Sequence, residues 1–235
     1  MDGQTKVEVT YFTDVLCVWA YVAQIRIDRL QQTFGDRIRF EDHFIPVFGS
    51  VNSLLEKNWA PKGGLDAYSE HVKSIGRKFD HIEINPAIWT SNIPASSSNC
   101  HLFLKAVQLL SLRGELAEHA GENSAQKNIF EQAVWEIRLA FFRDLVDVSS
   151  ADSQMGIAER LGLPLMKIEA LLKNGEAFAA LHDDFQLKEK FRITGSPTLL
   201  FNEGRQMIYG NVGYRVIEAN MQELLNQPDS QASWC

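Results

Sequence analysis

Hydrophobic and polar positions alternate along two stretches near the N-terminus of this chain. Residues 7–12 and residues 38–45 follow the two-residue period of β-strands, and Pro46 ends the second stretch. Between them, residues 18–34 place apolar side chains at helical spacing, and Gly35 is well placed to end that helix. A strand, a helix and a strand in so short a segment predict two parallel strands joined by a right-handed crossover.

The apolar spacing then becomes helical almost throughout residues 64–191. Residues 89–98 interrupt it with a polar, proline-containing stretch, which predicts a loop whose serines cap the next helix. After the helical region, residues 197–209 predict a β-hairpin and residues 214–225 a closing helix. The order βαβ, helices, ββα predicts an α/β fold in which both ends of the chain build one sheet.

Composition and charge narrow the function classes. The chain has 235 residues, 45% of them hydrophobic, and a formal net charge of −7. This acidic balance, with no basic run, argues against nucleic-acid binding. No apolar segment approaches the roughly 20 residues of a membrane span, and the first six residues lead into a strand without the apolar run of a secretion signal. We therefore expect a cytoplasmic protein with reduced thiols.

The three cysteines are too few and too scattered for a disulfide framework. Cys17 lies where the first strand gives way to a helix, and the aligned N–H groups at a helix start favour a thiolate. We expect it to be a nucleophile; the alternative is a buried structural thiol. Ala20 stands where a dithiol motif carries its second cysteine. Cys100 falls on an apolar helix and Cys235 at the chain end, so neither is well placed to substitute.

Other catalytic chemistry finds little support in the sequence. The six histidines show no metal-ligand spacing, and neither an HExxH nor a CxxC motif is present. The segment Gly210–Gly213 follows a predicted strand but has the wrong spacing for a phosphate-binding loop. We expect no metal.

Two segments resemble known motifs. Asp14–Tyr21 (DVLCVWAY) is similar to the active-site segment of the DsbA-like thioredoxin proteins, and Thr194–Thr198 (TGSPT) is similar to their cis-proline loop. This superfamily includes the FrnE-like group, the 2-hydroxychromene-2-carboxylate isomerases and the kappa-class glutathione transferases. The resemblance implies a thioredoxin-like fold with an all-helical insertion. Residues 1–62 and 186–235 would form the thioredoxin-like domain, and residues 63–185 the insertion.

The chain departs from this pattern at several positions. Val18 replaces the usual proline and Ala20 the resolving cysteine, while Cys17 stands where the isomerases and kappa enzymes carry serine. Val212 replaces an acidic residue that holds the γ-glutamyl group of glutathione in the kappa enzymes. Without a second cysteine, an external thiol such as glutathione must resolve a mixed disulfide formed on Cys17.

The resemblance also implies roles for other residues. Ser196 and Pro197 would offer free backbone groups on which a thiol peptide pairs as an added strand. Trp19 would flank the sulfur, although packing alone is an equally good interpretation. Lys62 and Asn211 would contact glutathione, the alternatives being a solvated lysine and a turn residue. Helices around Trp59, Tyr68, Trp89 and Phe103 would roof the cleft.

Three hypotheses follow. The first is a monothiol oxidoreductase or transferase that uses Cys17 with glutathione on a small-molecule or protein thiol or disulfide. The second is a glutathione-dependent cis–trans isomerase of the 2-hydroxychromene-2-carboxylate type. The third is a non-catalytic module that binds thiols or peptides. Relatives in this superfamily often form dimers, so the resemblance also implies that this chain could form a homodimer.

Overall fold

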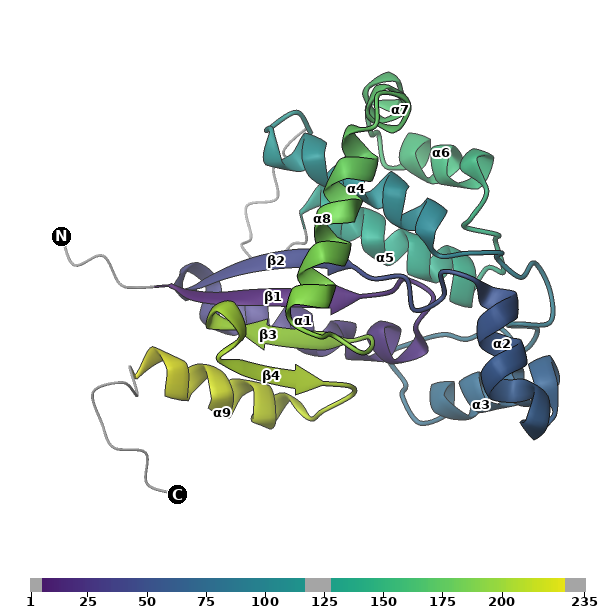
Figure 1. Cartoon of the computed structure of the whole chain (residues 1–235), viewed down its shortest axis with the longest axis horizontal. Coiled ribbons are helices and arrows are strands. Elements are labelled where there is room, and N and C mark those ends of the chain that lie inside the picture. The colour runs from purple at the N-terminus through teal and green to yellow at the C-terminus, as the bar shows by residue number, and fades with distance from the viewer. Residues whose placement is uncertain (1–5, 117–127, 227–235) are drawn as a thin grey trace.

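A four-stranded mixed sheet joins the two ends of the chain. The computed structural model describes residues 6–116 and 128–226. The strands are β1 (Val7–Thr13), β2 (Ile38–Phe44), β3 (Thr198–Phe201) and β4 (Gln206–Tyr209). Their order is β2-β1-β3-β4, with β1 parallel to β2 and antiparallel to β3 (Figure 1). The predicted parallel pair, the hairpin and the shared sheet are therefore confirmed.

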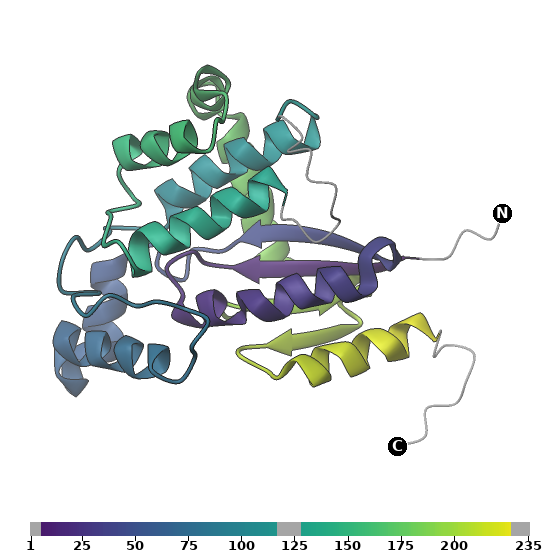
Figure 2. The same cartoon turned by 180° about the vertical axis from the view of Figure 1, so that it is seen from behind.

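Helices cover both faces of this sheet. Helix α1 (Val18–Phe34) and helix α9 (Tyr214–Leu225) lie on one face, and helix α8 (Glu176–Lys190) lies on the other (Figures 1 and 2). Alternate residues of β1 and β3 pack under α1 and α9. Because successive side chains of a strand point to opposite faces, the apolar residues at every second position form one buried face of the sheet. On the α8 side, Phe12 and Leu200 pack with Leu187 and Phe191.

The remaining helices belong to the middle of the chain. They are α2 (Val51–Trp59), α3 (Gly64–Gly76), α4 (Ser98–Leu112), α5 (Ile129–Phe142), α6 (Ala151–Arg160) and α7 (Leu165–Lys173). Helix α2 begins before residue 64, where the helical pattern was expected to start. Figure 1 shows α2 and α3 beyond the carboxyl end of β1, which is also the end where α1 begins. The predicted α/β fold with inserted helices is confirmed, whereas the domain boundaries stay a prediction.

A buried ionic cluster fastens the middle helices to the sheet. Asp184 on α8 accepts hydrogen bonds from the backbone N–H of Phe44 at 2.8 Å and from Lys105 Nζ on α4 at 2.9 Å. His43 Nδ1 lies 2.7 Å from the same carboxylate. Because charges removed from water need partners, these contacts fix α4 and α8 against the end of β2.

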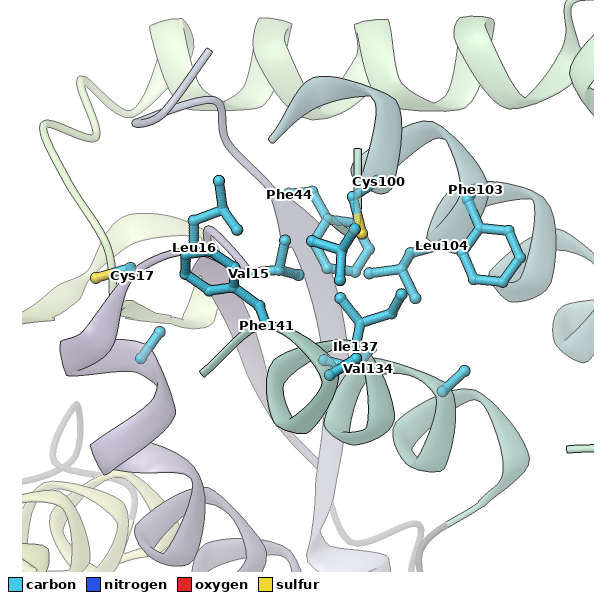
Figure 3. Close-up of a cluster of buried hydrophobic side chains, with 14 of the residues drawn as sticks. Val15, Leu16, Cys17, Phe44, Cys100, Phe103, Leu104, Val134, Ile137 and Phe141 are labelled. Atoms are coloured by element: carbon cyan, nitrogen blue, oxygen red, sulfur yellow. The ribbon is translucent and has the colours of Figure 1, made fainter. Parts of the chain in front are cut away.

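The largest hydrophobic cluster runs from the start of α1 into the helices. Figure 3 shows Leu16 beside the ring of Phe141 and Val15 facing Phe44, with Cys17 at the edge of the cluster. The connection between β1 and α1 is therefore held from both sides, by the sheet and by the inserted helices.

Candidate functional site around Cys17

Cys17 is the N-cap residue of α1, with an extended backbone (φ −81°, ψ 114°). Its carbonyl accepts the first helical hydrogen bonds, from the N–H groups of Ala20 at 3.1 Å and Tyr21 at 3.0 Å. In Figure 3 the sulfur points away from the labelled core side chains. The Sγ instead donates to the carbonyl oxygen of Ser196, 3.2 Å away. The two motifs singled out in the sequence thus meet through a direct hydrogen bond.

The Ser196–Pro197 peptide bond is cis, and two further contacts hold this loop. The Ser196 hydroxyl oxygen accepts from the backbone N–H of Asp14 at 2.9 Å, and the carbonyl of Pro197 accepts from the N–H of Gly210 at 2.8 Å. The Ser196 carbonyl accepts the Cys17 thiol in this structure, and a carbonyl oxygen can accept a second hydrogen bond, so docking of a thiol peptide on this loop stays a prediction.

The ionisation of Cys17 differs from the sequence expectation. Its side chain is only 7% exposed, and burial, the largest effect, raises its pKa above the ordinary thiol value. The charge of Asp14 acts in the same direction, while the hydrogen bond with Ser196 and then the N–H groups of Ala20 and Trp19 lower the pKa. The helix start does stabilise a thiolate, but desolvation is the stronger effect here and favours the neutral thiol.

The raised pKa of Cys17 predicts how the rate of its alkylation changes with pH. We expect the rate with iodoacetamide, followed by peptide mass spectrometry, to rise with pH and to have its midpoint above the ordinary thiol value of about 8.5. The fully buried Cys100, whose pKa burial raises well above the usual range, should stay unmodified and serves as the internal control. A midpoint below about 8 would contradict the burial argument.

The thiols other than Cys17 offer no second reactive group among the described residues. Cys100 lies on α4 and is wholly enclosed in the main core cluster, so its interpretation as a core residue holds. Cys235 lies outside the described residues.

Aromatic side chains gather on the helical side of Cys17. Tyr68 lies 5.0 Å from Trp59 and 5.2 Å from Trp89 between ring centres, and Phe48 lies 5.3 Å from Trp89. Burial raises the pKa of Tyr68, and the charge of Cys17 acts in the same direction. Trp89 lies in a loop with a positive φ of 62° rather than in a helix. Phe103, on α4, is fully buried.

The other three predicted site residues lie in different surroundings. Trp19 is partly buried and packs against the main core cluster. Lys62 is exposed, and its Nζ lies 4.8 Å from the ring centre of Trp59. Lys62 thus borders the aromatic group. Asn211 accepts a hydrogen bond from Arg26 Nη1 at 2.6 Å. Whether these three residues contact a ligand stays a prediction.

Sequence reasoning missed Asp14 as a residue of the site and Arg26 as the partner of Asn211. The Asp14 carboxylate is fully buried and accepts from Leu16 N–H at 2.9 Å, Phe48 N–H at 2.8 Å and Ser97 Oγ at 2.8 Å. Arg26 contacts Asn211 from the partly buried side of α1. A carboxylate inside an apolar stretch was a visible signal for Asp14. For Arg26 the signal was a charge four residues after the buried Val22, on one face of the helix.

No metal-binding group and no membrane-spanning helix is found in the described part of the chain. The described His, Cys, Asp and Glu side chains form no group of three or more that could hold a metal ion. None of the helices in residues 6–116 and 128–226 combines the length and apolar character needed to cross a membrane.

Comparison with solved structures gives the fold. A candidate protein disulfide isomerase from Nitrosomonas europaea matches with a TM-score of 0.65 and 17% identity, covering 97% of this chain and 100% of that one. The cytosolic disulfide reductase DsbM from Pseudomonas aeruginosa matches with a TM-score of 0.61 and 15% identity, covering 95% and 94%. It also matches in its glutathione complex, with a TM-score of 0.59, 15% identity and the same coverage.

A 2-hydroxychromene-2-carboxylate isomerase matches with a TM-score of 0.60 and 17% identity, covering 96% of this chain and 100% of that one. No curated protein sequence matches this chain. A family model described as the DSBA-like thioredoxin domain matches residues 8–222, which include both segments that form the site. The chain therefore belongs to the DSBA-like thioredoxin domain family.

Proposed function

We propose that this protein is a monothiol enzyme that uses Cys17 with glutathione, by disulfide exchange or by glutathione-dependent transfer. The observation that carries this proposal is the pairing of the Cys17 sulfur with the Ser196–Pro197 loop, 3.2 Å from the Ser196 carbonyl, with Ala20 in the place of a second cysteine. A cytosolic disulfide reductase of the same fold in complex with glutathione supports it.

The exchange reaction follows from one thiol. The Cys17 thiolate attacks one sulfur of a disulfide, the bond between the two substrate sulfurs breaks, and one sulfur leaves as a thiolate. The mixed disulfide on Cys17 is then attacked by glutathione, which takes the bound group and returns Cys17 to its reduced form. Because the resting thiol is buried and donates to the Ser196 carbonyl, that contact must break before the thiolate attacks.

Incubation with glutathione disulfide tests the proposal. We expect one glutathione adduct on Cys17 by peptide mass spectrometry, forming faster as the pH rises. The rate of total glutathione incorporation into the intact protein should fall by at least ~100-fold in Cys17→Ser, and the control Cys100→Ser should leave it unchanged. An equal rate in both variants, or no adduct in the wild-type protein, would contradict thiol exchange at Cys17.

The aromatic group of Phe48, Trp59, Tyr68 and Trp89 favours a second candidate function. Phe48, Tyr68 and Trp89 are buried in the main core cluster and only Trp59 is partly exposed, so this candidate rests on Trp59 at the edge of the group and on a 2-hydroxychromene-2-carboxylate isomerase that shares the fold. A protein that binds S-methylglutathione, isomerises an enone-like substrate and forms no mixed disulfide would support the isomerase. Binding that Cys17→Ser leaves intact, with no turnover of any kind, would support a binding module. A cytoplasmic location and a homodimer remain parts of the proposal.

A further inference from the structure

The short segment that carries Cys17 into α1 is held by hydrogen bonds from two distant elements. The backbone N–H of Asp14 donates to the hydroxyl of Ser196, in the cis-proline loop, at 2.9 Å. The backbone N–H of Val15 donates to Nε2 of His101, on α4, in a longer hydrogen bond of 3.4 Å. These acceptors lie 182 and 86 positions away from their donors in the chain. His101 thus connects the middle helices to the segment that ends at the sulfur.

The His101 side chain is fully buried next to the end of β2. Its ring stacks on Phe44, with 5.2 Å between ring centres and an interplanar angle of 20°. Asp14 Oδ1 lies 3.6 Å from Nε2, which is too far for a hydrogen bond. The Asp14 carboxylate already accepts from three other donors. The hydrogen bond that Nε2 makes is therefore the one from Val15.

The contact with Val15 fixes where the imidazole ring carries its proton. A ring nitrogen that accepts a hydrogen bond has no proton of its own, so the neutral ring of His101 is protonated at Nδ1. This Nδ1 is buried and has no hydrogen-bond partner among the described residues. A buried donor without an acceptor loses its hydrogen bonds to water and destabilises the folded state. An apolar side chain would avoid that loss, so packing alone does not account for a histidine here.

We infer that His101 is a positioning residue, which holds the Val15 N–H and thereby keeps the Cys17 sulfur at the Ser196 carbonyl. Figure 3 shows Val15 facing Phe44, the ring on which His101 stacks, whereas the sulfur points away from the labelled core side chains. His101 therefore acts through the backbone of Val15 and not on the sulfur itself. The inference rests on the proposed function and deepens it, because it names a residue outside both sequence motifs on which exchange at Cys17 depends.

NMR of the isotope-labelled protein tests the hydrogen bond without any substrate. The ring nitrogens of His101, assigned by comparison with His101→Gln, should show a proton on Nδ1 and none on Nε2. The Val15 amide should exchange with solvent deuterium about 5–10-fold faster in His101→Leu than in His101→Gln. Leucine offers no acceptor, whereas the side-chain oxygen of glutamine can take the place of Nε2. A proton on Nε2, or equal exchange of the Val15 amide in the two variants, would overturn the inference.

Exchange kinetics then test the role of His101 at Cys17. The rate with glutathione disulfide should fall by about 10-fold in His101→Leu and stay within about twofold of wild type in His101→Gln. Because leucine removes the unpaired Nδ1–H, His101→Leu should be at least as stable in urea as His101→Gln, so its lower rate would not reflect unfolding.

The two variants also separate failure of this inference from failure of the proposed function. Equal rates in His101→Leu and His101→Gln would overturn the role of His101 while leaving thiol exchange at Cys17 in place. An absence of glutathione adducts in the wild-type protein would contradict the proposed function. The NMR measurements, which need no glutathione, would still decide whether His101 holds this segment.

Discussion

Replacing Asp14 by alanine should destabilise the folded protein by about 3–5 kcal/mol. The carboxylate is 0% exposed and accepts hydrogen bonds from Leu16, Phe48 and Ser97, which come from three different segments. Its own backbone N–H donates to the Ser196 hydroxyl. Alanine would leave these buried donors without an acceptor, and each unpaired donor costs free energy. The same loss would loosen the contact between Cys17 and Ser196.

Urea unfolding followed by circular dichroism measures this effect. Asp14→Asn keeps one of the two oxygens and should lose less stability than Asp14→Ala. Ser97→Ala removes a single donor and should cost about 1–2 kcal/mol, which makes it the matched control for one hydrogen bond. A value for Asp14→Ala within about 1 kcal/mol of wild type would show that these contacts contribute little to folding.

Replacing Asp42 by asparagine should stabilise the protein, and more so at alkaline pH. Burial, followed by the charge of Glu131, raises the pKa of Asp42 from 3.8 to about 7, while Arg138 opposes the shift. Because folding raises the pKa of Asp42, protonated Asp42 does not lower the free energy of unfolding at a pH below the pKa it has in the unfolded chain. That stability is lost as the pH rises through about 7, where the buried carboxyl group ionises. Asparagine carries no charge to desolvate at any of these pH values.

Urea unfolding of wild type and Asp42→Asn at two pH values tests this sign. The increase in the free energy of unfolding caused by Asp42→Asn should be larger at about pH 8 than at about pH 5 by roughly 1–3 kcal/mol. We expect less than the full difference that the pKa shift implies, because the Asp42 side chain is partly exposed. A gain that is the same at both pH values would contradict the raised pKa. The variant would also be a useful background for titrating Cys17, since alkaline ionisation of the thiol must be separated from alkaline unfolding.

The amino-acid pattern by itself determined the elements and their order. The predicted helix over residues 18–34 agrees with α1, and the predicted closing helix over residues 214–225 agrees with α9. Alternation in two short stretches identified β1 and β2, because a half-buried strand exposes every second side chain. The motifs around Cys17 and Ser196–Pro197 were visible as well, since each depends on residues adjacent in sequence. For α2 the sequence predicted only a helix around Trp59, without its start, because just two of the nine residues of α2 are buried.

Only the tertiary structure decided how these residues behave chemically. The helix start predicts an activated thiolate at Cys17, yet the packing of the surrounding segments desolvates the sulfur and places it on the Ser196 carbonyl, 179 residues away. Asp14 and Arg26 likewise gained their hydrogen-bond partners from segments distant in the chain. Local patterns report backbone preference and amphipathic faces. Burial and charge at a site depend on which distant segments meet there, because both are set by the loss of water between them.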